Sequence, residues 1–160
     1  MKTLGKVVVA IVICVAVLFV IFRITGLEPH NRTPGLWLKG NVVTTPVSDW
    51  SFTDKIPQIH IQTNTWYLLP HSVTINCIAY NGQLYVASVY PANTPRHHWN
   101  DDVTRDPHVR LQIGDQIYDR TLTPVTDPAE RQAVLDARAK KYPLLKIPAG
   151  AVIHIFHVVG

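Results

Sequence analysis

An unbroken apolar run from Val7 to Phe22 limits this chain more than any other feature of its sequence. As a helix, about 16 residues rise roughly 24 Å, a little less than the ~30 Å hydrocarbon core of a bilayer. Neighbouring apolar residues lengthen the helix, and the side chains of Lys6 and Arg23 can reach the two interfaces. The sequence therefore predicts a single-pass transmembrane anchor over residues 1–26.

A cleavable signal peptide is the alternative, because Lys2 and Lys6 would form its charged start. The exit from the run, Arg23 to Glu28, has no small-x-small cleavage pattern and begins with a charge, which favours an anchor. The numbers of basic residues before and after the apolar run are nearly equal, so the positive-inside rule does not decide the orientation of the helix in the membrane. Since a short N-terminal tail usually stays in the cytoplasm, the soluble domain is expected on the extracytoplasmic side of the membrane.

The remaining part of the 160-residue chain is long enough for one domain with its own core. The net charge of +4 is dispersed and forms no basic run, so nucleic-acid binding is not expected. Cys14 lies inside the apolar run and Cys77 in an expected strand, so no disulfide is predicted within the chain. Cys77 is expected to be a small buried hydrophobic residue.

Residues 27–57 are rich in Pro, Gly, Thr and Ser, yet they carry three large aromatic side chains. An exposed tether does not need such side chains, so the segment is expected to pack on the following domain as an irregular arm. Its expected contacts are Leu36, Trp37, Val42 and Val43.

Residues 58–160 read mainly as strands. Asn81-Gly82 between two apolar runs is a strong signal for a two-residue hairpin. Alternation and β-branched residues predict strands over Gln58–Leu69, Val73–Tyr80, Leu84–Tyr90, Val109–Ile113, Gln116–Leu122 and Ala151–Val159. One substantial helix is expected: Asp127 as N-cap, Pro128 in the first turn, Glu130 completing a capping box, and an end at Tyr142-Pro143. Antiparallel strands with so little helix predict a small β-barrel.

Hydrolase and nucleotide-binding signatures are missing from the sequence. His154 and His157 are three apart in an expected strand, so they point to opposite faces and do not form a metal grip. His97, His98 and His108 are a better cluster, because loop residues are not bound by strand parity. No cysteine or carboxylate with ligand spacing accompanies them, and no metal site is predicted.

The stretch His71–Pro107 combines a strand, the Asn81-Gly82 hairpin, a polar loop with Trp99 and an Asp-Pro turn, and is followed by the strand Val109–Ile113. This pattern resembles the pyridoxamine-phosphate-oxidase-like split β-barrel superfamily, and within it the deazaflavin-dependent nitroreductase family. The capped helix beginning at Thr126 is similar to one in that family. The resemblance implies a mainly β fold, a split β-barrel with one or two helices, preceded by the transmembrane helix.

The resemblance also implies a flavin (FMN) or a deazaflavin (F420) in a cleft beside the barrel, often at a homodimer interface. Hydroxyl groups and an arginine can donate to a phosphate, and a tryptophan can stack on the cofactor ring. The candidate cofactor-binding residues are Ser72, Thr74, Ser88, Tyr90, Thr94, Arg96, His98 and Trp99. The sequence assigns no catalytic residue.

Three functions follow. The first is a membrane-anchored oxidoreductase that uses FMN or F420 to reduce a small molecule, with a flavin favoured if the domain is exported. The second is a non-catalytic barrel that has lost the flavin, since the family's glycines are absent near Ser72 and Ser88. Such a barrel could bind haem through His71 or His98, another ligand, or a protein partner. The third is a structural membrane protein with Trp37–Phe52 as its contact surface.

Overall fold

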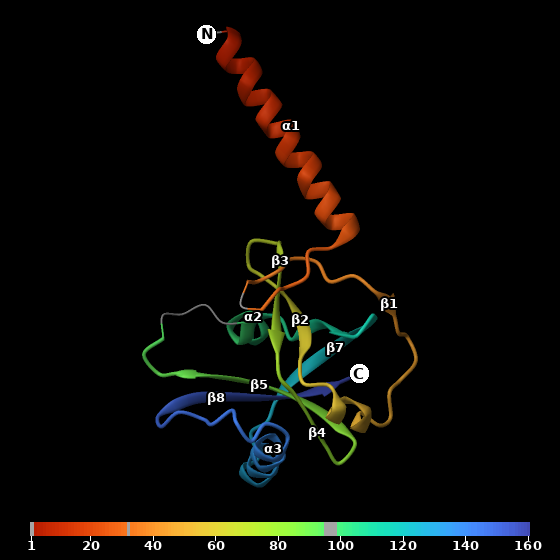
Figure 1. Ribbon diagram of the computed structural model, residues 1–160, viewed down its shortest axis with the longest axis vertical. Helices are drawn as coiled ribbons and strands as arrows, with labels where there is room; N and C mark the ends of the chain where they lie inside the picture. Colours follow the sequence, from red (N-terminus) through yellow and green to blue (C-terminus); the bar gives the residue numbers. More distant parts are fainter. Residues whose placement is uncertain (1, 32, 95–98) are drawn as a thin grey trace.

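The computed structural model describes residues 2–31, 33–94 and 99–160. One long helix stands apart from a β-rich domain in which a curved sheet is flanked by short helices (Figure 1). In chain order the elements are α1 (Lys2–Thr25), β1 (Asn41–Val42), η1 (Ser51–Lys55), β2 (Ile59–Asn64), β3 (Pro70–Ile75), β4 (Cys77–Tyr80), β5 (Gln83–Pro91), α2 (Trp99–Arg105), β6 (His108–Ile113), β7 (Gln116–Pro124), α3 (Pro128–Lys141) and β8 (Ala151–Val159).

Helix α1 has the length and composition of a membrane span over its 23 residues Thr3–Thr25, a test that a signal sequence also passes. Its apolar side chains are exposed along the whole helix. At its base, α1 meets the domain through Trp37, whose ring centre lies 5.1 Å from that of Phe19. The guanidinium of Arg23 lies 5.5 Å from the centre of the Trp37 ring. The helix is therefore seated on the arm that follows it.

The sheet closes on itself at one residue. Its strands follow the order β3-β2-β6-β7-β8-β5-β4, with β1 attached to β7 outside this path. Strands β3 and β4 are at opposite ends of that order, yet only Asn76 separates them in the chain. Because the chain passes directly from one edge to the other, the sheet curls into a barrel. The prediction of one strand over Val73–Tyr80 was wrong, since closure requires this break.

The Asn81-Gly82 hairpin is confirmed. Both residues have positive φ, 50° and 75°, as a type I′ turn requires, and Tyr80 pairs with Gln83 across it. The strand predicted over Gln58–Leu69 ends earlier, at Asn64. The loop that follows, before β3, exposes Trp66, Tyr67 and Leu68. Leu68 has a positive φ of 65°, which is incompatible with a strand.

Two hydrophobic clusters hold the domain together, one inside the barrel and one between its outer face and α3. Alternation along β5 divides its side chains between them. The inner cluster includes Ile61, Leu84, Val86, Leu111 and Leu122, and the outer cluster includes Ile78, Tyr85, Val134, Tyr142 and Ile155. Cys77 is fully buried in the inner cluster with a free thiol, as predicted.

The predicted N-cap of α3 is confirmed, since a carboxylate oxygen of Asp127 accepts the backbone N–H of Glu130 at 2.7 Å. The reciprocal half of the expected capping box is replaced by another contact. The Glu130 carboxylate accepts the hydroxyl of Tyr85 on β5 at 2.8 Å. This side chain therefore ties α3 to the barrel instead of closing on its own helix.

The arm is more regular than the sequence predicted. Asn41 and Val42 form β1, which pairs in parallel with Gln116 and Ile117 of β7. Strand β8 pairs only with the later part of β7, so β1 covers an otherwise open edge. Trp37, Leu38 and Trp50 are buried, whereas Val42, an expected contact, is 56% exposed. The side chain of Val42 faces solvent, whereas Val43, another expected contact, packs against the inner cluster.

Candidate functional site

A groove between β5, the β3–β4 junction and the segment after α3 brings together four of the residues predicted to bind a cofactor. Its volume is about 440 Å³, and we call it the β5 groove. Thr74, Ser88, Tyr90 and Trp99 line it together with Gln58, Ile75, Asn76, Ala87, Val89, Arg138, Leu145, Lys146 and Pro148. A smaller cavity of about 340 Å³ adjoins it at Tyr90 and is lined by Thr94, Asp101 and His154 among others.

Two cations that sequence analysis did not select contribute positive charge to the β5 groove. Arg138, in the last turn of α3, is only 7% exposed and donates to the backbone oxygen of Leu145 at 3.0 Å. Lys146 follows in the loop before β8 and is exposed. The sequence shows several basic residues near the end of this helix. Which of them faces the barrel depends on how α3 packs, and this could not be predicted.

The hydroxyl of Ser88 and the ring of Trp99 are already engaged within the protein. Ser88 is buried and donates to the side-chain oxygen of Asn100 at 3.0 Å. Trp99, at the start of α2, is 7% exposed, and its ring centre lies 5.5 Å from that of Phe156. These contacts seat α2 against the barrel and leave only the margin of the Trp99 side chain at the groove.

Tyr90 lies where the β5 groove and the smaller cavity meet. Its hydroxyl is 3.0 Å from Nε2 of His154 on β8, and the two rings are stacked with their centres 5.9 Å apart. Ser88 and His154 are register partners on β5 and β8, which places His154 two positions from the partner of Tyr90. Tyr90 and His154 therefore form a polar aromatic pair beside the groove.

Ser72 is not part of the groove. It is fully buried on β3, and its backbone exchanges two hydrogen bonds with Gly35 of the arm, at 2.8 and 3.0 Å. A Cβ at position 35 would lie 2.6 Å from the Ser72 hydroxyl, so glycine permits this close approach. The structure gives Ser72 a place beneath the arm. Arg96 and His98 lie outside the described residues, and their proposed roles stay predictions.

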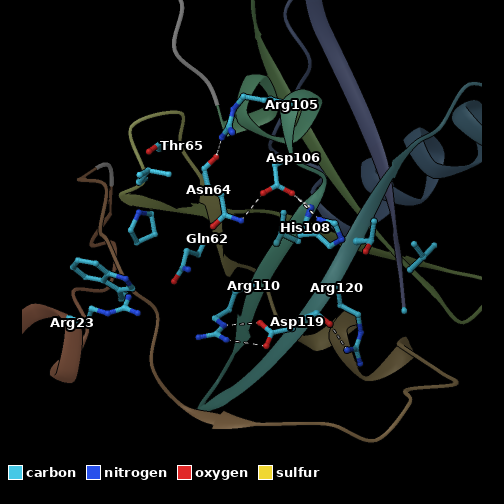
Figure 2. Close-up of a pocket in the computed structure, with 17 residues that line it drawn as sticks. Arg23, Gln62, Asn64, Thr65, Arg105, Asp106, His108, Arg110, Asp119 and Arg120 are labelled. Atoms are coloured by element: carbon cyan, nitrogen blue, oxygen red, sulfur yellow. Dashed lines mark hydrogen bonds and ion pairs between the residues drawn. The ribbon is translucent and has the colours of Figure 1, made fainter.

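A cavity of about 730 Å³ lies at the base of α1, and we call it the basal cavity (Figure 2). None of the predicted site residues that the structure describes lines it. Its walls are Arg23, Trp37, Gln62, Asn64, Thr65, Leu68, Pro70, Arg105, Asp106, His108, Val109, Arg110, Asp119, Arg120, Thr121, Val159 and Gly160. No local pattern in the sequence indicated this cavity, because its residues come from α1, the arm, the β2–β3 loop, α2 and five strands.

Both carboxylates of the basal cavity are partnered. Asp119 binds the guanidinium of Arg110 in a two-pronged contact at 2.7 and 3.0 Å. Asp106 accepts from the side-chain amide of Asn64 at 2.8 Å and lies 2.8 Å from Nδ1 of His108. The hydrogen bond from Asn64, followed by that from His108, lowers the pKa of Asp106 below its ordinary value.

Among the described residues, no group of three or more His, Cys, Asp or Glu side chains is arranged to hold a metal ion. His108 contacts Asp106, whereas His60 lies 2.9 Å from Gln112 and His157 lies 3.1 Å from Gln83. His97 and His98 of the expected cluster lie outside the described residues. The described histidines are thus spread over separate polar contacts.

No protein-family model matches the sequence, and the search of curated proteins found no significant relative. Solved structures are similar. A conserved hypothetical protein of Mycobacterium tuberculosis is 12% identical with a TM-score of 0.54, covering 78% of this chain and 85% of its own. A domain-swapped dimer is 24% identical with a TM-score of 0.52, covering 64% and 80%.

A third similar structure is a candidate 5-nitroimidazole antibiotic resistance protein of Bacteroides thetaiotaomicron. It is 14% identical with a TM-score of 0.50, covering 82% of this chain and 90% of its own. Together with the closed sheet, these likenesses define the chain as a split β-barrel protein. The likenesses show a shared fold, in agreement with the split β-barrel that the sequence predicted.

Proposed function

We propose that this protein is a membrane-anchored oxidoreductase that holds FMN or a deazaflavin (F420) in the β5 groove and reduces a small molecule. One observation carries the proposal. Thr74, Ser88, Tyr90 and Trp99 were chosen from the sequence resemblance, and they line one groove to which Arg138 and Lys146 add positive charge. The same groove has a volume of about 440 Å³, within the usual range of roughly 300–1,000 Å³ for ligand sites.

The donors in the groove fit the phosphate of such a cofactor. Arg138 and Lys146 can provide charge-assisted hydrogen bonds, and the hydroxyl of Thr74 can add a neutral one. One nitrogen of the Arg138 guanidinium donates to the backbone oxygen of Leu145. This hydrogen bond fixes the direction of the guanidinium group. When bound, the cofactor supplies the hydride chemistry, while the protein binds it, orients it and limits access of water.

The aromatic side chains fit the cofactor ring less well. Trp99 packs on Phe156 and is 7% exposed, so its ring is not free to stack on a flavin. Tyr90 is half-buried and reaches both cavities, so we assign the ring contact to the Tyr90–His154 pair. Thr94 belongs to the same smaller cavity. Cofactor binding by Arg96 and His98, which lie outside the described residues, stays part of the proposal.

The anchoring role of α1 is part of the proposal. Its length and apolar surface support a single membrane span, and an extracytoplasmic position of the domain is proposed with it. The proposed division is an anchor over 1–26, an arm over 27–57 and the barrel over 58–160. A homodimer is proposed as well, and one similar structure being a domain-swapped dimer supports it.

The test is cofactor binding by the full-length chain in detergent. We expect either a flavin absorption band in the purified protein or saturable binding of FMN or F420. Lys146→Gln removes an exposed cation of the groove and is expected to weaken binding about tenfold, the loss of one charge-assisted hydrogen bond. Lys140→Gln, on the exposed side of α3, is the matched control. A colourless protein that binds neither cofactor would refute the proposal.

A non-catalytic barrel is the second candidate, and one observation favours it. The Ser88 hydroxyl and the Trp99 ring are used inside the protein, as expected for a barrel that has lost its flavin. The haem version of this candidate relies on His71 or His98. His71 lines none of the cavities described above, so His98 is the proposed ligand. Titration with haem and observation of a Soret band separate it from the first candidate.

A further inference from the structure

The loop between β2 and β3 presents three large side chains to solvent. Trp66 is 73% exposed, Tyr67 45% and Leu68 93%, and the two aromatic rings lie edge to face with centres 5.4 Å apart. Such a cluster on a loop is unfavourable in water, whereas tryptophan and tyrosine are enriched at membrane interfaces. Figure 1 shows this loop at the same end of the domain as the base of α1.

The basal cavity connects the loop to α1. Thr65 and Leu68 of the loop and Arg23 and Trp37 at the helix base line the same space. Arg23 is in the last turn of α1, where a membrane-spanning helix reaches the headgroup region. The cavity therefore lies at the level of the headgroups when α1 spans a bilayer, with the exposed tip of the loop beside it.

Arg23, Arg105 and Arg120 leave uncompensated positive charge in this cavity, since none of the three forms an ion pair with a carboxylate of the described residues. Arg23 packs over the ring of Trp37, and Arg105 donates to the backbone oxygen of Asn64. Arg110, by contrast, is paired with Asp119. Figure 2 shows Arg23 and Arg105 on either side of Asn64 and Thr65.

We propose that the basal cavity binds the phosphate of an anionic phospholipid from the membrane that holds α1, with Trp66, Tyr67 and Leu68 dipping into the same interface. Guanidinium groups suit a phosphodiester, and basic residues beside a membrane helix attract anionic headgroups. The proposal rests on the anchoring of α1 in the proposed function. It is independent of any cofactor, because the basal cavity and the β5 groove share no residue.

The first experiment reconstitutes the full chain into vesicles of phosphatidylcholine mixed with phosphatidylglycerol. The protein is then extracted in mild detergent, and its retained lipids are counted by native mass spectrometry. We expect one phosphatidylglycerol per chain, with phosphatidylcholine not retained. The double variant R23Q/R105Q is expected to lower this retention more than tenfold, about fivefold for each arginine. K55Q/K140Q removes two exposed cations outside the cavity and should leave retention unchanged.

The second experiment places the loop in the membrane. Vesicles containing brominated phosphatidylcholine should quench tryptophan fluorescence in the full-length chain, and the quenched component should be smaller in Trp66→Phe. Trp50 and Trp99 are buried in the domain and provide the unquenched background, while Trp37 at the base of α1 contributes equally in both proteins. Equal quenching in Trp66→Phe and the unsubstituted protein would overturn the loop contact.

The remaining outcomes are distinct. Retention of inorganic phosphate without phosphatidylglycerol would overturn the lipid proposal in favour of a site for a soluble anion. A chain that floats with vesicles but retains both lipids equally would overturn the headgroup site while leaving the anchor intact. A chain that does not float with any vesicle would instead refute the anchoring part of the proposed function.

Discussion

The phenol of Tyr142 is the point where α3, β4 and the arm are joined, and its removal is the most direct test of the packing. Its oxygen accepts the backbone N–H of Cys77 at 3.2 Å, and its hydroxyl faces the backbone oxygens of Pro57 at 2.7 Å and Cys77 at 2.8 Å. Because the hydroxyl has one proton, it makes one donated and one accepted hydrogen bond at a time.

Tyr142→Phe keeps the ring and deletes only these bonds. A buried donor left without its acceptor costs about 1–3 kcal/mol, and a lost neutral hydrogen bond costs about 0.5–1.5 kcal/mol. Lys141 still binds the oxygens of Thr53 and Cys77, so part of the junction survives. The expected loss in free energy of unfolding is therefore about 2–3 kcal/mol.

The assay is urea unfolding of the full chain in mild detergent, followed by tryptophan fluorescence. Tyr67→Phe is the matched control, because Tyr67 is 45% exposed and its hydroxyl has no hydrogen bond to the described residues. We expect a lower midpoint at unchanged slope for Tyr142→Phe and no shift for the control. A loss below about 0.5 kcal/mol would refute the reasoning, since that is the range of an ordinary surface substitution.

The same residue predicts the response to alkaline pH. Burial, followed by the proximity of Cys77, raises the pKa of Tyr142 above its ordinary value of 10.0. Above that pH the unfolded chain loses a proton that the folded chain keeps, so stability is complete below about pH 10 and falls as the pH rises. Tyr142→Phe should reduce the fall by at most about 1.4 kcal/mol per pH unit. The fall that remains comes from Tyr85, whose pKa burial and Glu130 raise in the same way.

Two further predictions concern the caps and the basal cavity. Asp127→Ala removes the acceptor for the Glu130 N–H and should lower the free energy of unfolding by about 1 kcal/mol, measured by the same urea titration. The lowered pKa of Asp106 stabilises the fold above the ordinary carboxyl value, 3.8, and this contribution is lost as the pH falls below it. Asp106→Asn should therefore make acid unfolding less steep, and an unchanged acid transition would contradict the contacts with Asn64 and His108.

Local signals predicted the parts of the fold that depend on neighbours in sequence. Asn81-Gly82 specified its turn because few other dipeptides accept two positive φ values. Asp127 specified the start of α3 through a contact only three residues away. The strand Ala151–Val159 was predicted with its observed bounds, since β-branched residues and alternation cover its whole length.

Features that depend on distant pairing were missed or misplaced. The break at Asn76 follows from closure of the barrel, which no local pattern encodes. The Glu130 carboxylate accepts a hydrogen bond from Tyr85, 45 residues away, instead of completing the expected capping box, because α3 packs on β5. Arg138 and Lys146 line the β5 groove because α3 packs against the barrel. Ser72 lies outside the groove, where its backbone pairs with Gly35 of the arm.

The two cavities face different surroundings, and this constrains how the proposed reaction could be supplied. α1 ends at the basal cavity, while α3 lies at the end of the domain opposite α1 (Figure 1). The β5 groove includes Arg138 of α3 and the segment that follows it, so part of its wall lies at the end of the domain opposite α1 (Figure 1). A water-soluble cofactor that enters from that end would not cross the membrane interface. A lipid headgroup at Arg23 and Arg105 would hold the barrel in this orientation, because it adds a second attachment beside α1.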